Sequence, residues 1–371
     1  MKKIIFLFIL VFTFSSFLQE ENTIDVNQQL IDEKIVLVFA GDIMGHSPQF
    51  KAAYSVLNDQ FNYNPCFKFV KPYIQEADFA FVNLEVPLAG KPYSGYPNFS
   101  SPDELLDATK NAGFNIILTA NNHVADRGKQ GLERTIHTIQ NSDLKYAGSY
   151  LSKNHRDSIY PLLLNHKGFN IAILNCTYGT NMNPVHYPNI VNMLDSAQVL
   201  TDIKRAKYLN VDYIVAFLHW GNEYELKANK SQEDFANFLA ANGVDLIIGS
   251  HPHVVQNVDF INVSNKNIPV VYSLGNFISN QRNENTNGGI IAKIEISKLN
   301  KNVSTIEYLP VYVHRGKLNG LYQYYLIPTT DYIFMPTKYQ IPQADSTFLR
   351  KFDFETRKRL QNISVWNKFL K

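Results

Sequence analysis

Short runs of apolar residues, each followed at once by polar residues, recur along the chain. Several have the composition of buried strands, namely residues 35–40, 79–82, 114–118, 213–218, 244–248 and 270–274. Stretches with the apolar spacing of a helix come before some of these strands, as in residues 67–76 and 196–209. Because helices that alternate with continuously apolar strands are typical of parallel sheets, the pattern predicts an α/β protein with mostly parallel pairing.

Two of the expected helices carry start and stop signals at their ends. Ser101 and Pro102 are residue types that begin helices, and Gly113 follows as a stop signal. Ser231 and Gly243 are expected to bound a second helix in the same way. Each of these helices therefore leads directly into one of the apolar strands.

The last part of the chain has a different pattern. Residues 290–296 and 308–313 read as strands of an antiparallel arrangement. Residues 345–371 are rich in basic side chains and predict a terminal helix.

The N-terminus has the layout of a secretory signal. Lys2 and Lys3 precede a continuous apolar run over residues 4–14, and polar residues follow from Gln19 onward. The run is shorter than the roughly 20 residues that cross a bilayer. No small-x-small triplet marks a cleavage site, so residues 1–22 are expected to be a signal peptide or a signal anchor. Either one exports the body of the protein to the cell envelope, as a periplasmic, outer-surface, secreted or membrane-anchored protein.

The composition is that of an ordinary globular protein. Of 371 residues, 45% are hydrophobic and 18% are charged, and the formal net charge is only +2. Since no stripe of lysine and arginine is present, nucleic acid is not expected as a partner. Cys66 and Cys176 are expected to be unpaired, and neither accompanies a histidine as in a thiol or zinc site.

Potential metal ligands follow five of the predicted strands. These side chains are Asp42, Glu85, Asn122 with His123, His219, and the pair His251 and His253. Each one alone also fits a plain structural role, such as a turn, a helix cap or a packed histidine. Because the carboxyl ends of parallel strands meet at one edge of a sheet, their recurrence there favours a single shared metal site.

The types of ligand indicate the metal. Carboxylate, amide and imidazole groups together suit Mn²⁺, iron or Zn²⁺, whereas Mg²⁺, kept as a further option, favours fewer histidines. The number of ligands fits one or two ions. A carboxylate that bridges two ions holds them roughly 3.5–4 Å apart, where they activate a water and clamp the leaving oxygen.

Six ordered segments resemble the CapA-type proteins of capsule and poly-γ-glutamate synthesis, which are similar to the calcineurin-like metallophosphoesterases. The segments are residues 40–45, 83–85, 120–123 with Asp126 and Gly128, 219–224, 249–253 with Gln256, and 272–277. The resemblance implies a four-layer α-β-β-α sandwich in which two mixed β-sheets pack face to face. It also implies a CapA-like domain over residues 34–285, which residues 286–371 complete or extend.

The resemblance assigns roles to the candidate residues. The implied metal ligands are Asp42 and His253 for one ion, Asn122, His219 and His251 for the other, and Glu85 as the bridge. His123 is implied to protonate the leaving group or to stabilise the charge of the transition state. Further candidates, as ligands or as supporting contacts, are His46, Asn83, Asn121, Glu223, Gln256 and Asn276.

Two positions depart from the phosphoesterase pattern. Met44 stands where a histidine is usual, with His46 two positions further on, and Glu85 replaces a shorter aspartate. These departures leave a single ion and an asymmetric pair as open alternatives.

Two functions follow from the resemblance. The first is a metal-dependent hydrolase in which an activated water attacks a phosphoester, ester or amide bond of an anionic surface polymer or its lipid-linked precursor. The second is a non-catalytic polymer-binding or export accessory that retains the pocket for a metal or an anion. Both imply contact with a membrane-bound synthesis or export complex.

Overall fold

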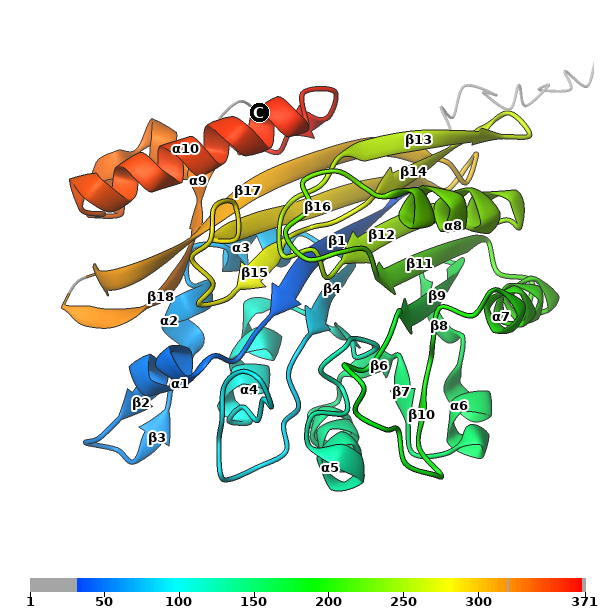
Figure 1. Cartoon of the computed structure of the whole chain (residues 1–371). Helices are drawn as coiled ribbons and strands as arrows, with labels where there is room; N and C mark the ends of the chain where they lie inside the picture. The colour runs from blue at the N-terminus through cyan, green and yellow to red at the C-terminus, as the bar shows by residue number, and fades with distance from the viewer. Residues whose placement is uncertain (1–31, 319, 369–371) are drawn as a thin grey trace, which may run out of the picture. The chain divides into compact units, whose positions relative to one another are not determined.

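The larger β-sheet of the computed structural model is built around strand β1, Lys34–Ile43 (Figure 1). The structure describes residues 32–318 and 320–368, and the predicted leader lies outside them. In spatial order the strands are β18 (Leu321–Pro328), β17 (Val303–Leu318), β16 (Gly288–Ser297), β1, β4 (Phe79–Leu84), β5 (Ile116–Leu118) and β6 (Lys145–Ala147). β1, β4, β5 and β6 are parallel, whereas β16, β17 and β18 run antiparallel to their neighbours. The sheet is therefore mixed.

The smaller sheet is also mixed. Its strands in spatial order are β13 (Val258–Val263), β14 (Lys266–Val271), β12 (Leu246–Ser250), β11 (Tyr213–His219), β9 (Phe169–Thr177) and β8 (Leu162–His166). The inner strands are parallel, and β13 and β8 are antiparallel edges.

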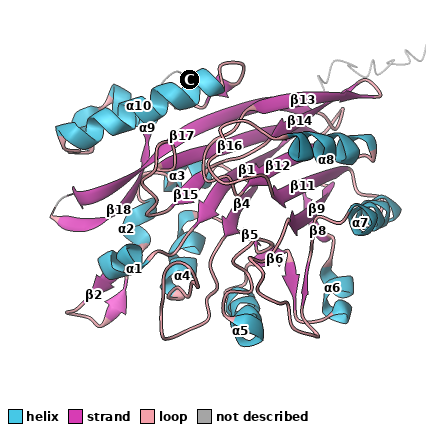
Figure 2. Ribbon diagram, in the orientation of Figure 1, coloured by secondary structure: helices cyan, strands magenta, loops and turns pink. Residues whose placement is uncertain are grey.

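Alternate side chains of the central strands face two different layers. Along β1, Leu37 and Phe39 lie in a cluster shared with the smaller sheet and its helices, whereas Val38 and Ala40 lie in a cluster shared with α4 and α5. Helices α4 (Glu104–Ala112) and α5 (Gly128–Asn141) cover the outer face of the larger sheet, and α7 (Ser196–Tyr208) and α8 (Lys230–Ala241) cover that of the smaller sheet (Figure 2). The predicted four-layer α-β-β-α sandwich with two mixed sheets is confirmed.

Shorter elements complete the described part of the chain. They are α1 (Ser47–Ala53), β2 (Tyr54–Ser55), β3 (Gln60–Phe61), α2 (Asn64–Phe67), α3 (Lys71–Ile74), β7 (Ser149–Tyr150), α6 (Lys153–Ile159), β10 (Ile190–Val191), β15 (Asn276–Ile278), α9 (Thr329–Phe334), η1 (Pro336–Lys338), α10 (Gln343–Arg359) and β19 (Ser364–Val365). β15 pairs with the end of β1, and β19 pairs with β17. None of the helices in the described residues is both long and apolar enough to span a bilayer. Cys66 and Cys176 are buried and unpaired, as expected.

The helix predicted over residues 67–76 is wrong. The structure has two short helices there, α2 and α3, with Pro65 and Pro72 in their first turns. Proline lacks an amide hydrogen, so Pro72 fits the first turn of a new helix better than the middle of a continuous one.

Both predicted serine caps are wrong, although the stop at Gly113 is confirmed. The amide of Ser101 donates to the carbonyl of Pro87, which holds Ser101 in the preceding loop, and α4 begins only at Glu104. Helix α8 is capped by Asn229, whose side chain accepts from the amide of Gln232. Gly113 ends α4 at a φ of 116°, where a residue without a Cβ fits best.

The predicted terminal helix over residues 345–371 is too long. Helix α10 ends at Arg359, and the chain continues into β19 alongside β17. Trp366 follows β19 and is completely buried. Burial of this large ring favours the extended conformation over two more turns of helix.

Candidate metal centre

The carboxyl ends of strands from both sheets meet at one place and bring the predicted ligands together. Asp42 is the last residue but one of β1, Glu85 follows β4, His219 ends β11, and His251 and His253 follow β12. Each of these five side chains is at most 3% exposed. Residues that are far apart in the sequence therefore line one buried pocket, which is where open α/β sheets bind their ligands.

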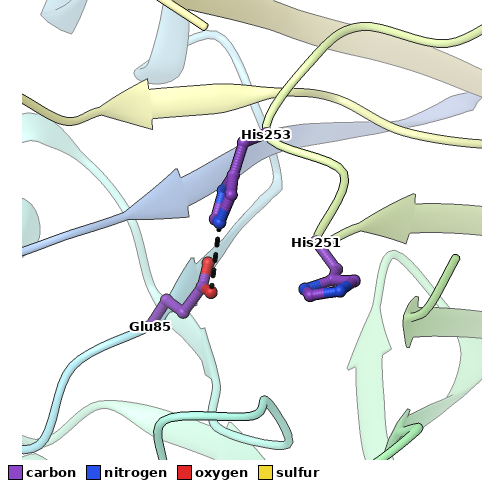
Figure 3. Close-up of side chains that lie close together, drawn as sticks. All are labelled: Glu85, His251 and His253. Atoms are coloured by element: carbon purple, nitrogen blue, oxygen red, sulfur yellow. Dashed lines mark ion pairs between the residues drawn. The ribbon is translucent and has the colours of Figure 1, made fainter. Parts of the chain in front are cut away.

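Glu85 is common to both sets of candidate ligand atoms found in the described residues. One set is Glu85, His251 and His253, and the other is Asp42, Glu85 and His219, with the atoms of each set within 4.8 Å of one another. Figure 3 shows the ring of His253 pointing at the Glu85 carboxylate, with His251 to one side. Oε1 of Glu85 lies 3.5 Å from Nε2 of His219 and 3.9 Å from Nε2 of His253.

Several polar atoms in this pocket lack a hydrogen-bond partner within the described residues. They are both carboxylate oxygens of Glu85 and Nδ1 of His251. A buried carboxylate without donors is costly, because it has lost its water and gained nothing in return. A divalent cation among these atoms would supply the missing partner, so the residues present fit a metal.

The electrostatics of the metal-free pocket disfavour charge on both its carboxyl and its imidazole groups. Burial, together with the charge of Asp42, raises the pKa of Glu85 well above its usual value. Burial and the neighbouring His251 hold the pKa of His219 well below its usual range. Burial and His253 lower the pKa of His251 to about 3. Both imidazoles are therefore neutral at pH 7 and keep the lone pair that a metal requires.

Hydrogen bonds from surrounding residues hold the ligands in place. Nδ2 of Asn83 donates to Oδ1 of Asp42 at 2.7 Å, and the amide of His251 donates to Oδ2 at 3.3 Å. Nδ1 of His253 lies 3.1 Å from Oδ1 of Asn276, and Nδ2 of Asn276 donates to the carbonyl of Thr286 at 2.8 Å. Such supporting contacts fix the ring orientation of metal-binding histidines.

His219 uses both ring nitrogens. Nδ1 lies 3.0 Å from Oγ of Ser250, and Nε2 lies 2.9 Å from Oδ1 of Asn122. Asn122 thus presents its amide oxygen to the same pocket, where the sequence places it as a ligand. Nδ2 of Asn122 in turn donates to Oδ1 of Asn181 at 3.3 Å.

His123 is oriented by a carboxylate. Its Nδ1 lies 2.7 Å from Oδ2 of Asp126, which also accepts from the amide of Phe99 at 3.0 Å. The Phe99 ring packs edge-on against the imidazole, with centroids 4.7 Å apart. A carboxylate on Nδ1 fixes the tautomer and leaves Nε2 as the atom that exchanges a proton.

The remaining candidates have unequal positions. Glu223 has a side chain 43% exposed, and its Oε1 lies 3.9 Å from Nε2 of His253. His46 is bonded to Gln49, and its pKa is lowered to about 4, chiefly by burial. Asn121 shapes the loop, because its Nδ2 donates to the carbonyl of Leu84 and its Oδ1 accepts from the amide of His123.

Gln256 has its side chain committed to the surrounding structure instead of the metal pocket. Its Oε1 accepts from Gln232, and its Nε2 donates to the carbonyls of Glu225 and Lys227. These bonds fasten the loop that carries Glu223, so Gln256 acts on the pocket only through that loop.

Three half-exposed or exposed tyrosines lie beside the pocket, and none of them is among the candidate site residues predicted from the sequence. The ring centroid of Tyr178 lies 4.5 Å from that of His251, that of Tyr224 lies 6.2 Å from His253, and that of Tyr96 lies 6.5 Å from His123. Burial raises the pKa of Tyr178 to about 12, so its hydroxyl remains a donor. Tyr178 directly follows β9, which is the signal that could have identified it.

The family model described as "Bacterial capsule synthesis protein PGA_cap" matches residues 36–281, about two thirds of the chain. The chain belongs to the PGA_cap family. The matched range includes every residue of the metal pocket described above.

Two curated proteins are similar to this PGA_cap chain. The capsule biosynthesis protein CapA of Bacillus anthracis is 27% identical over 296 residues, which are 77% of this chain and 69% of that protein. The PGA biosynthesis protein CapA of Bacillus subtilis (strain 168) is 27% identical over 298 residues, which are 77% of this chain and 73% of that protein.

Solved structures show more distant likenesses. A phosphatase from Mycoplasma pneumoniae is 14% identical, with a TM-score of 0.46, over 76% of this chain and 95% of that one. The NAD nucleotidase of Haemophilus influenzae is 10% identical, with a TM-score of 0.47, over 90% of this chain and 57% of that one. At these TM-scores the likeness says nothing about the reaction.

Proposed function

We propose that this PGA_cap protein is an extracytoplasmic, metal-dependent hydrolase. Its substrate is a phosphoester, ester or amide bond of an anionic surface polymer or of its lipid-linked precursor. The observation that carries the proposal is the Glu85 carboxylate, which is buried and unpartnered within reach of His219 and His253. The names of the two curated CapA relatives support a capsule or PGA polymer as the substrate class.

The chain's own residues supply binding and proton transfer. Asp42, Glu85 and the imidazoles hold a divalent ion, with Mn²⁺, iron or Zn²⁺ suited to this ligand set. When bound, such an ion supplies Lewis acidity to a water and to the scissile group. His123, when doubly protonated, gives the proton on Nε2 to the leaving group, while Asp126 accepts from Nδ1–H, orients the ring and stabilises the imidazolium.

The proposed location rests on the N-terminal sequence. Two lysines followed by the apolar run over residues 4–14 are typical of an export signal. A polymer made at the envelope also places the partners there, as a membrane-bound synthesis or export complex. Fractionation of cells that express the full-length chain tests this point, and a cytoplasmic pool alone would refute it.

Metal analysis combined with turnover tests the proposed reaction. The full-length protein is assayed for bound metals and for hydrolysis of bis(p-nitrophenyl) phosphate and of γ-linked glutamate oligomers. We expect Glu85→Gln to lose metal and turnover. We expect His123→Gln to keep the metal and to lose about 100-fold or more in kcat. His137→Gln, at an exposed position of α5, is the matched control and is expected to behave as wild type.

The opposite result defines the alternative function. Wild-type protein that holds the metal but hydrolyses none of these substrates would refute the hydrolase. It would point to a non-catalytic polymer-binding or export accessory that uses the same pocket.

A further inference from the structure

Two arginines line a cavity between the segment after β15 and strand β17. The cavity has a volume of about 340 Å³, and its walls are Arg282, Asn287, Tyr312, Arg315, Asp345 and Phe348. A second cavity of about 220 Å³ shares Arg282, Asn287 and Phe348 with the first. Arg282 therefore faces both spaces.

The charges of these two arginines are not neutralised by carboxylates. Within the described residues, neither side chain has an acidic oxygen at ion-pair distance. Arg282 donates to the carbonyl of Val313 at 3.3 Å and lies over the ring of Tyr324 at 5.9 Å. Arg315 donates to Oδ1 of Asn280 at 3.1 Å. Other arginines of this chain do pair with acids, as Arg156 does with Asp202 at 2.6 Å.

The acids in the cavity walls are engaged elsewhere. Asp345 is bonded to Nδ1 of His314 and accepts from the hydroxyl of Tyr312 at 2.7 Å. Glu284 pairs with Lys351 at 2.7 Å. Among the described residues, the two guanidinium groups are thus left without a carboxylate at ion-pair distance, although Asp345 lines the same cavity. Burial is the main cause that lowers the pKa of Arg282, and the charge of Arg315 lowers it further, as expected for two cations near each other.

A short segment, residues 276–282, joins Arg282 to the metal centre and is held in place by hydrogen bonds. Asn276, which contacts His253, donates from Nδ2 to Oε1 of Gln281 at 2.9 Å. The amide of Asn280 donates to Nδ1 of His46 at 3.4 Å, and the hydroxyl of Tyr324 donates to Oδ1 of Asn280 at 2.6 Å. Because six extended residues cover at most about 20 Å, Arg282 lies within that distance of Asn276.

Resting on the proposed function, we infer that Arg282 and Arg315 form a carboxylate-binding subsite for an anionic polymer whose scissile bond lies at the metal centre. Guanidinium groups bind carboxylates through paired hydrogen bonds. A γ-linked glutamate chain leaves one α-carboxylate free on every unit. Two arginines at one wall can therefore hold two of its groups beyond the cleavage point, and the subsite selects a polycarboxylate over a neutral polymer.

Binding of a labelled oligomer tests this subsite. The affinity of full-length protein for fluorescein-labelled γ-linked hexaglutamate is measured by fluorescence anisotropy. We expect the double variant R282Q/R315Q to raise Kd roughly tenfold or more and to weaken its dependence on salt. R282K/R315K keeps the charges but loses the paired geometry and is expected to lie between. R350Q is the matched control, since Arg350 lies over Tyr332, which lines neither cavity.

The outcomes separate this inference from the proposed hydrolase. An unchanged Kd for hexaglutamate, in a double variant that keeps the wild-type melting temperature, would overturn the subsite. Tighter binding of inorganic polyphosphate than of hexaglutamate, if it depends on the two arginines, would also overturn it. If the double variant does not fold, the single variants R282Q and R315Q carry the same test. Wild-type turnover of bis(p-nitrophenyl) phosphate, which has no carboxylate, tests the hydrolase alone. Arginine-dependent binding of hexaglutamate by metal-loaded protein that hydrolyses neither bis(p-nitrophenyl) phosphate nor hexaglutamate would support the subsite and refute the hydrolase.

Discussion

At Glu85 the needs of folding and of metal binding conflict. A carboxyl group with a raised pKa in the folded state makes the fold less stable as the pH rises. The loss begins near the group's ordinary pKa of 4.5 and is complete above its pKa in the folded state. In metal-free protein at pH 7, the Glu85 carboxylate therefore acts against folding. With a cation bound, the same charge becomes favourable.

Replacing this carboxylate separates the two effects. In EDTA at pH 7, we expect Glu85→Gln to raise the free energy of unfolding by about 1–3 kcal/mol, because it removes the cost of burying a carboxyl group that is ionised in the unfolded chain. Added Mn²⁺ or Zn²⁺ should then stabilise the wild type but not the variant. Chemical denaturation with and without metal measures both effects. A variant that is less stable than wild type in EDTA would contradict this interpretation.

Asp126 is a positioning residue, since it acts through His123. Asp126→Asn turns the acceptor opposite Nδ1 into a group that can also donate, so the tautomer of His123 is no longer fixed. We expect the metal content to be unchanged and kcat to fall roughly tenfold or more, with a shifted pH profile. Asp234→Asn, on the exposed side of α8, is the control. A purely structural role would lower the melting temperature and leave the pH profile unchanged.

The positions of most site residues could be predicted because parallel strands deliver their last residues to one edge. Asp42, Glu85, His219 and His251 converge for that reason. Gln256 could not be excluded, because its partners are the carbonyls of Glu225 and Lys227, which no sequence pattern shows. Tyr178 was missed because β9, which it follows, was not among the predicted strands, and because a tyrosine is not one of the metal ligands sought there.

Among the elements, the approach of β15 to β1 depends on a glycine. A Cβ on Gly41 would lie 1.9 Å from the carbonyl oxygen of Gly275, next to Asp42 and Asn276. We expect Gly41→Ala to destabilise the fold by about 1–3 kcal/mol and to weaken metal binding, because both strand ends must move. Gly179→Ala is the control, since no atom lies within 4 Å of its added Cβ. Thermal unfolding and metal titration together provide the measurement, and wild-type values for both would refute the argument.

The pairing of β1 with β16 gives a pH-dependent contribution to stability. Burial alone would raise the pKa of Glu295, but hydrogen bonds from Lys293 and Lys34 outweigh it and lower the pKa to about 2. A lowered carboxyl pKa stabilises the fold above pH 4.5, and this contribution disappears as the pH falls toward 2.

Glu295→Gln should therefore lower the free energy of unfolding by about 1–2 kcal/mol at pH 7 and by little at pH 2. The value at pH 7 takes into account that the carboxylate is partly exposed to solvent. Urea unfolding of both proteins across this pH range measures the difference. A difference that does not shrink on acidification would show that the carboxylate charge is not responsible.

The strands were easier to predict than the helix ends. Continuous apolar runs such as residues 213–218 identify buried strands directly, because both faces are covered. Helix starts depend on whether a side chain can reach a free amide, which tertiary contacts decide. Ser101 has the right residue type but is held by Pro87, whereas Asn229 reaches Gln232.

In the molecule as a whole, the C-terminal strands complete the larger sheet. β16 pairs with β1 from Lys34 to Ala40, although some 250 residues separate the two strands in the sequence. Apolar alternation predicts that such strands exist, but it cannot specify their partners, because many registers satisfy the same pattern. Whether residues 286–371 complete or extend the main domain was open for this reason.

A chain that ends after residue 285 should therefore fail to fold, even though it contains the whole PGA_cap match. β1 would lose β16 along its length, and Leu309, Val311 and Leu326 would leave the apolar cluster beneath α4 and α5. A chain that ends after Arg359 keeps these strands and loses the buried Trp366, so we expect it to fold with about 3–5 kcal/mol less stability. Circular dichroism and limited proteolysis compare both with the full chain. Cooperative unfolding of the 1–285 chain would show that the part of the chain that carries the metal pocket folds without β16, β17 and β18.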